Sequence, residues 1–250
     1  MCLQINAWAG FAPGLTTAED WRAWAERPAL PSGAGEVSLP EVPAMLRRRL
    51  SPLGRMVAWA AFRCQGDGTQ LPIVLASRYG DAERSLQLLA DFARGEPMSP
   101  ADFALSVHNA IGAMYSIARS DAQASCSIAA GPASAAAGFI EAAGLLADGA
   151  KEVMLVCYDA PLPGDYASFA DEPAAPYAWA WRVSAPPASS DGAPSISVDW
   201  DAAEQDEAAE GATPPGLPFG LEAMRFAISP DASRKSWERT CAGRRWRWRS

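Results

Sequence analysis

Residues 125–134 read SCSIAAGPAS, and the chain runs directly into AAAGFIEAAGLLADGAKEVMLV, which ends at Val156. The first residues of this stretch indicate a strand, and residues 132–148 have a helical pattern whose alanine and glycine faces allow very close backbone approach. The run EVMLVCY at 152–158 is continuously apolar, as in a strand buried on both faces of a parallel sheet. A strand, a helix and a second strand in this order predict a right-handed βαβ crossover.

The same alternation extends back to the N-terminus. Apolar runs of strand length occur at LQINAWAG, at LPIVLA (71–76) and at YAWAWRV (177–183), and we expect the last to pair antiparallel at an edge or in a hairpin. Helical patterns occupy residues 52–64, 81–94 and 99–118. We therefore expect an α/β fold with a mostly parallel five-stranded sheet and helices on both faces.

A further helix start lies near the N-terminus. The residues Thr16-Thr17-Ala18-Glu19 have the Ser/Thr-x-x-Glu arrangement of a capping box, in which side chains at both ends bond the free amides of the first turn. Trp21 and Trp24, three residues apart, would form the apolar face of this helix.

The composition divides the chain into three parts. Residues 1–183 carry the predicted α/β domain. Residues 184–218 are rich in Pro, Ala, Ser, Asp and Glu, and we interpret them as an acidic, mobile linker, because such sequence buries little apolar area. Residues 219–250 form a C-terminal tail that ends in RRWRWRS. This basic, aromatic end could stack on nucleic-acid bases or bind an anionic surface, but we favour packing against the acidic linker or a partner protein.

Charge and composition exclude several classes of function. The net charge of −8 and the pI near 4.8 argue against nucleic acid as a partner, because phosphate binding needs clustered positive charge. The five cysteines have no metal-ligand spacing and a single histidine to assist them, so we expect no metal site. The absence of a signal peptide and of a membrane-length apolar run favours a cytoplasmic protein.

Candidate catalytic residues are few. The sequence has no Gly-x-Ser-x-Gly elbow, no phosphate-binding loop and no Gly-x-Gly-x-x-Gly motif, so no cofactor is expected. An acyltransferase or hydrolase would have to use Cys126 or Ser134 with His108, the one histidine. We interpret Cys126 as structural, and the loop acids Asp165, Asp171 and Glu172 as solvated charge.

The residues around the opening stretch resemble a known family. The run from Asn109 through Met114 and Tyr115 to SCSIAAGP, with the alanine- and glycine-rich helix and LLADGAKEVMLV, resembles the β-ketoacyl-ACP synthases of the thiolase superfamily, which commonly read SISIATAC, a similar helix and GDADVM. RRRLS (47–51), SRYGD (77–81) and SPADFALSVHNA (99–110) are similar to short chain-length-factor proteins of aryl polyene and xanthomonadin-type pigment clusters. The resemblance covers about residues 1–183 and implies the N-terminal half of a thiolase-like fold.

The resemblance places the catalytic cysteine of the synthases on Pro132. Proline offers no nucleophile, although its fixed φ suits a first helical turn. The two catalytic histidines of the family lie in the second half of the thiolase fold, which has no counterpart here, and His108 precedes the cysteine position. The resemblance therefore implies a catalytically inactive β-ketoacyl synthase homologue.

In this superfamily the strand that leads to the cysteine pairs with its mate across the dimer, and the segment equivalent to residues 103–117 lines the partner's acyl pocket. The resemblance implies a heterodimer with an active ketosynthase in aryl polyene or related polyketide or fatty-acid-type biosynthesis, with an acyl carrier protein involved indirectly. The residues that would border the pocket or the partner are Phe103, Leu105, Val107, His108, Met114, Ser127, Ala129 and Gly131.

Two alternatives stay open at this point. One is a homodimeric acyl-binding or scaffold protein that has no synthase partner. The other is the acyltransferase or hydrolase described above, which would use Cys126 or Ser134 with His108.

Overall fold

The computed structural model describes residues 1–33, 35, 37–187, 195–203, 216–229 and 235–250. The strands are β1 (Cys2–Phe11), β2 (Ile73–Ala76), β3 (Ser125–Ile128), β4 (Val153–Asp159), β5 (Tyr177–Ser184), β6 (Ser195–Ala202), β7 (Ser236–Cys241) and β8 (Arg244–Arg249). The helices are α1 (Ala18–Glu26), α2 (Ala44–Arg49), α3 (Pro52–Gln65), α4 (Ala82–Ala93), α5 (Pro100–Ala104), α6 (Ala110–Arg119), α7 (Ser134–Ala147) and α8 (Phe219–Ile228), with a 3₁₀ helix, η1 (Gly164–Phe169).

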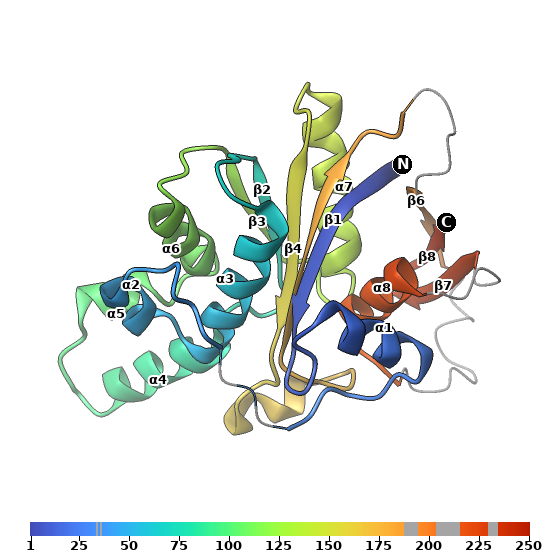
Figure 1. Cartoon of the computed structure of the whole chain (residues 1–250). Coiled ribbons are helices and arrows are strands. Elements are labelled where there is room, and N and C mark those ends of the chain that lie inside the picture. The colour runs from blue at the N-terminus through green and yellow to red at the C-terminus, as the bar shows by residue number, and fades with distance from the viewer. Residues whose placement is uncertain (34, 36, 188–194, 204–215, 230–234) are drawn as a thin grey trace.

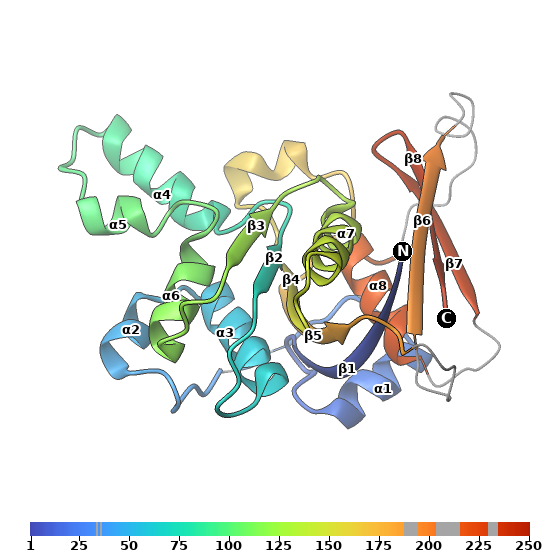
Figure 2. The same ribbon diagram turned by 90° about the horizontal axis from the view of Figure 1, so that it is seen from above.

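The described strands form one eight-stranded sheet in the order β3-β2-β4-β5-β1-β6-β8-β7. The predicted βαβ unit is present, because β3 and β4 both pair parallel to β2 and α7 connects them. The sheet curls strongly, so that its C-terminal end, β6-β8-β7, lies across α7 and α8 from β2 and β4 (Figure 2). The α/β fold expected from the sequence is confirmed.

The sheet is mixed rather than mostly parallel. Within residues 1–183 five strands are present as expected, and β5 pairs antiparallel, as predicted, to β4 on one side and to β1 on the other. The connection between β4 and β5 contains four prolines and forms only the short helix η1. It therefore lacks the helix that usually carries a parallel crossover. With partners on both sides, β5 is an internal strand, not an edge strand.

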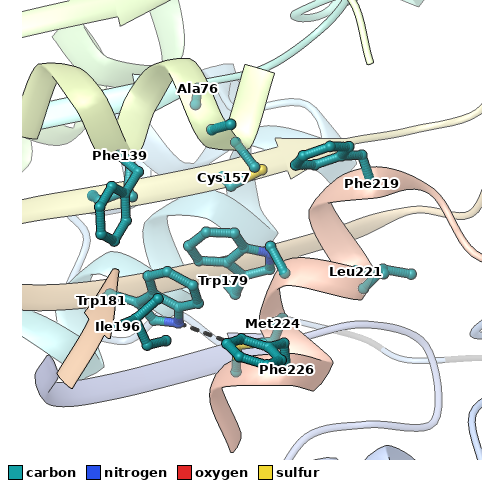
Figure 3. Close-up of a cluster of buried hydrophobic side chains, with 14 of the residues drawn as sticks. Ala76, Phe139, Cys157, Trp179, Trp181, Ile196, Phe219, Leu221, Met224 and Phe226 are labelled. Carbon is teal, nitrogen blue, oxygen red and sulfur yellow. Dashed lines mark hydrogen bonds between the residues drawn. The ribbon is translucent and has the colours of Figure 1, made fainter. Parts of the chain in front are cut away.

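One face of the sheet is covered by α1, α7 and α8 (Figure 1). Trp179 and Trp181 of β5 stack on each other with ring centroids 4.2 Å apart, beneath the apolar side chains of α8 (Figure 3). The indole Nε1 of Trp181 donates to the Met224 sulfur at 3.3 Å, and that of Trp179 donates to the Gly220 carbonyl at 2.9 Å. These bonds satisfy two polar atoms that burial would otherwise leave without partners.

The other face is covered by α3 and α6. The helix α3 begins at Pro52 after the N-cap Ser51, whose side chain accepts a hydrogen bond from the Gly54 amide, as the Ser-Pro pair predicts. Most of its side chains are buried, which confirms the prediction from its nearly uniform apolar composition. No helix among the described residues is long and apolar enough to cross a bilayer.

Two helix boundaries differ from the sequence prediction. The capping box of α1 is one residue later than expected, because Thr17 is the N-cap and Asp20, not Glu19, closes the box. The predicted helix 99–118 is divided into α5 and α6 by residues 105–109, which form turns. Trp21 and Trp24 are buried in edge-to-face contact, as expected for the apolar face of α1.

The chain after residue 184 differs from the predicted linker and tail. Residues 195–202 form β6, which pairs with β1 and β8, while the rest of the acidic segment at 188–194 and 204–215 lies outside the described residues. The tail contributes α8 and the β7–β8 hairpin to the core. In RRWRWR the tryptophans point into this core, while Arg247 pairs with Asp199 and Asp201 on the adjacent strand. The interpretation of these arginines as partners of the acidic segment is confirmed for β6.

Candidate functional site

The turn between β3 and α7 holds the position at which the resemblance places the catalytic cysteine. Pro132 is half-buried and follows Gly131, whose φ of +57° is readily adopted by glycine. Helix α7 begins at Ser134 with Ala133 as its N-cap. Pro132 therefore precedes the helix and is not part of its first turn, contrary to the sequence prediction, because the chain makes a left-handed turn at Gly131 before the helix starts.

Ser134 and Cys126 lack the surroundings of a nucleophile. The hydroxyl of Ser134 donates to the Gly131 carbonyl at 2.7 Å and accepts from the Ala130 amide at 3.0 Å, so it closes the turn before α7. Burial, with a smaller contribution from Glu141, raises the pKa of the Cys126 thiol, whereas a reactive cysteine needs a lowered pKa. The structure supports the interpretation of Cys126 as structural.

His108 is held by the backbone rather than by a nucleophile. Its Nε2 lies 3.0 Å from the Ser77 carbonyl oxygen, so this nitrogen carries the proton and donates it. The ring also lies against Gly80, where an added Cβ would be 3.0 Å from the His108 Cδ2. Neither Cys126 nor Ser134 is hydrogen-bonded to His108.

The other residues expected to border a pocket lie on two separate surfaces. Phe103 is 57% exposed and lines an apolar hollow of about 400 Å³ with residues of α4, the most prominent of which are Leu89 and Phe92. Leu105 and Met114 line a much smaller hollow beside α2 and α3. Val107 is exposed between α5 and α6. Within the described part of the chain, no single cavity holds all of these residues.

The strand β3 lies at one end of the sheet. It pairs with β2 on one side, and no described strand pairs with its other side. The Ile73 amide donates to the Ala124 carbonyl and the Ser77 amide to the Ile128 carbonyl, both at about 3 Å. Because alternate residues of a strand bond to the same neighbour, the peptide groups of Ser125 and Ser127 point away from β2. The Ser127 hydroxyl is buried without a hydrogen-bond partner, and Ala129 just beyond the strand is exposed.

A polar cluster that the sequence analysis did not identify lies at the carboxyl ends of β2 and β4. Asp159 is half-buried at the end of β4 and accepts hydrogen bonds from the Ser77 hydroxyl and the Arg78 amide, each at 2.9 Å. The Tyr79 amide and the Tyr177 hydroxyl are both 3.4 Å from its carboxylate. Burial raises the pKa of Asp159 to about 7, against the lowering effect of these hydrogen bonds.

Charged residues surround this cluster and connect it to the C-terminal segment. The Arg78 guanidinium pairs with both oxygens of Asp171, and the Glu172 carboxylate pairs with Arg239 of β7 at 2.8 Å. Glu172 also accepts from the Phe219 amide at the start of α8. The expectation that Asp171 and Glu172 are solvated loop charge is therefore wrong for Glu172, whose side chain is largely buried, and Asp171 is ion-paired. In the sequence only the adjacent acidic pair is visible, and nothing indicates that Arg78 and Arg239 bind it.

The raised pKa of Asp159 predicts how stability depends on pH. Between about pH 4 and pH 7 the folded chain keeps a proton that the unfolded chain has lost, so the free energy of unfolding falls as pH rises through this interval. The change amounts to about 4 kcal/mol for a group shifted by this much. The variant Asp159→Asn keeps an acceptor oxygen, does not titrate, and should lose this pH dependence in urea unfolding measured from pH 4 to pH 8.

The matched control for this prediction is Asp199→Asn. The ion pair with Arg247 lowers the pKa of Asp199, so this variant changes the pH profile in the opposite direction, and mainly below pH 4. Identical slopes for the wild type and Asp159→Asn between pH 4 and pH 7 would contradict the assignment of the buried proton.

Among the described residues, no group of His, Cys, Asp and Glu side chains could hold a metal ion. The family model described as "Beta-ketoacyl synthase, N-terminal domain" matches residues 21–249. The chain belongs to this family. The match extends to β8, so the tail that the sequence resemblance left out is part of the family domain. No curated protein sequence matches the chain.

Solved structures agree with this family. A chain of the complex "Ketosynthase (ApeO) in Complex with its Chain Length Factor (ApeC) from Xenorhabdus doucetiae" is 28% identical, with a TM-score of 0.80 and full coverage of both chains. The ishigamide ketosynthase/chain length factor is 13% identical over 81% of this chain and 68% of its own, with a TM-score of 0.64. A β-ketoacyl synthase from Burkholderia phymatum STM815 has a TM-score of 0.61 at 11% identity over 80% of this chain, which spans 64% of that synthase. The last two show the shared fold alone.

Proposed function

We propose that this ketosynthase-like chain is a non-catalytic, chain-length-factor-like subunit that pairs with an active β-ketoacyl-ACP synthase in aryl polyene or related polyketide or fatty-acid-type biosynthesis. The observation that carries the proposal is the outer side of β3, directly before the turn that contains Pro132, with which no strand of the described residues pairs. The partner strand would hydrogen-bond to the peptide groups of Ser125 and Ser127. Phe103 and Val107, both exposed, would meet the partner beside this strand.

The comparison with the ApeO–ApeC complex supports a subunit of this kind. Its matched chain is covered in full, as is this chain, whereas the synthase from Burkholderia phymatum continues well beyond the matched region. A chain that has proline at the cysteine position keeps the scaffold around the turn and provides no thiol there for an acyl group. The acyl chemistry would then belong to the partner synthase, to which a carrier protein delivers the acyl group.

The test is co-expression of the tagged chain with a full-length β-ketoacyl-ACP synthase. We expect a stable heterodimer by size-exclusion chromatography with mass measurement. The variant Ser127→Pro should abolish it, because proline removes an amide that points away from β2 and leaves the bonds to β2 intact. The melting temperature of the variant chain alone should stay within a few degrees of the wild type, which separates lost pairing from lost folding.

The control is Ala23→Ser, an exposed position on α1, which packs on β1 and α8 and should leave the heterodimer intact. Incubating the heterodimer with a radiolabelled acyl carrier protein should label the synthase subunit alone. A homodimer in place of the heterodimer would favour the scaffold alternative, and covalent label on this chain would overturn the non-catalytic assignment.

A further inference from the structure

The helices α4 and α5 form an arm that leaves the sheet at residues 77–81 and returns at residues 105–109 (Figure 1). Neither helix contains a buried residue, so the apolar core does little to fix its direction. The arm is therefore held mainly by polar contacts, which are Arg84 of α4 donating to the Arg49 carbonyl at 2.8 Å and the bonds at its base, where its two ends meet. There the His108 ring donates to the Ser77 carbonyl and lies against Gly80.

The outgoing end of the arm is fixed by three amides bonded to side chains. The amides of Arg78 and Tyr79 donate to Asp159, and the Gly80 amide donates to the Ser77 hydroxyl at 2.8 Å. The Ser77 hydroxyl in turn donates to Asp159. These residues form no regular secondary structure, so the three amides depend on side chains for their partners.

The side chain of Arg78 connects this base to the opposite end of the chain. Its guanidinium pairs with Asp171 and lies 3.8 Å from Glu172. Glu172 in turn binds Arg239 of β7 and the first amide of α8. Arg239 also donates to the Leu217 carbonyl at 3.2 Å. The arm and the β7–β8 hairpin lie on opposite sides of the central strands (Figure 1), so these ion pairs cross the end of the sheet.

The ion pairs that form this connection are largely shielded from solvent. The side chains of Arg78, Glu172 and Arg239 are all 12–13% exposed, so removing one leaves a largely buried neighbour with one ion pair fewer. Such a loss is costly in a partly buried network, and the energy is released by movement of the least constrained segment. Of the segments that touch the network, the arm is the one whose helices, α4 and α5, contain no buried residue.

We propose that Glu172 and Arg239 are positioning residues for the arm, acting through Arg78, so that the C-terminal hairpin fixes the direction in which α4 and α5 leave the sheet. This assigns a role to the C-terminal segment beyond filling the core. It deepens the proposed function, because the arm carries Phe103, which is proposed to meet the partner. All the contacts that hold the arm lie within this one chain, so the proposal can be tested without a partner.

The test is amide hydrogen exchange of the full chain without a partner. In Arg239→Gln we expect exchange at the amides of Arg78, Tyr79 and Gly80 and over α4 to accelerate about tenfold, the equivalent of about 1.4 kcal/mol. Arg239→Lys keeps the charge and should restore most of the protection. Glu172→Gln keeps an acceptor for the Phe219 amide and should reproduce the effect of Arg239→Gln, which provides a second route if that variant folds poorly.

Arg247→Gln is the matched control, since Arg247 lies on the other strand of the same hairpin and its ion pairs with Asp199 and Asp201 do not reach the arm. It should change exchange in the arm less than twofold. Faster exchange of β7 and β8 alone in Arg239→Gln, with the arm unchanged, would overturn the proposal. Failure of the chain to pair with a synthase would leave this exchange result intact, so the two proposals fail independently.

Discussion

Replacing Gly138 by valine is expected to destabilise the folded chain by about 3 kcal/mol, because α7 leaves no room for a side chain at this position. A Cβ on Gly138 would lie 2.7 Å from the Leu155 Cδ1 atom and 2.8 Å from the Ala76 Cβ atom, and both neighbours are fully buried. The Ala76 Cβ is fixed to the backbone of β2, so relief requires α7 and the sheet to move apart. Urea unfolding followed by circular dichroism measures the loss.

The same substitution six residues later in α7, at Gly144, provides the control. Gly144 also lies within α7, but an added Cβ there has no neighbour within 4 Å. The variant Gly144→Val should therefore change stability by no more than about 0.5 kcal/mol, since valine is at least as good a helix former as glycine. Equal effects at the two positions would show that helix propensity, and not the approach of α7 to the sheet, decides the result.

This close approach is the part of the fold that the sequence specifies most directly. The alanines and glycines after Pro132 predict a helix that lies very close to a neighbouring backbone, and residues 152–158 predict a strand buried on both faces. Both features depend on local pattern, namely helical periodicity and an uninterrupted apolar run. The βαβ unit and the α/β fold could therefore be derived from residues 125–158.

The antiparallel pairing of β5 could be predicted from its own sequence, but its position inside the sheet could not. That position depends on pairing with β1, which is far away in the sequence and leaves no local signal in residues 177–184. The strand β6 could not be predicted either, because its sequence SISVDWDA has the alternation of a half-buried strand but lies within an acidic, proline-rich stretch. The average composition of that stretch obscured the eight residues that form the strand.

The candidate site also has one part that could be predicted from the sequence and one part that could not. Pro132 could be identified from the aligned motif, because the motif is continuous in sequence. The cluster around Asp159 brings together residues 77–79, 171–172, 177 and 239, which only the topology of the sheet places side by side. A buried carboxylate has no signature in a single sequence, since its surroundings and not its neighbours in the chain raise its pKa.

Trp248→Ala is expected to lower the free energy of unfolding by about 4 kcal/mol, because the indole fills the space between the curled end of the sheet and two helices. Trp248 is fully buried and in contact with Phe139 of α7, Phe219 of α8 and Trp237 of β7. The cavity left by alanine would separate the β7–β8 hairpin from the face that it covers. Circular dichroism is the suitable probe, because the variant removes a fluorophore.

Trp200→Ala tests whether this effect depends on position rather than on loss of a tryptophan. Trp200 lies on the adjacent strand β6, is 36% exposed, and contacts the buried Trp246 from the solvent side, so its removal should cost only about 2 kcal/mol. A large difference between the two variants follows only if the last fifteen residues belong to the core. If Trp248→Ala were as mild as Trp200→Ala, the hairpin would be an appendage to the fold, and Arg239 could not hold the arm through it.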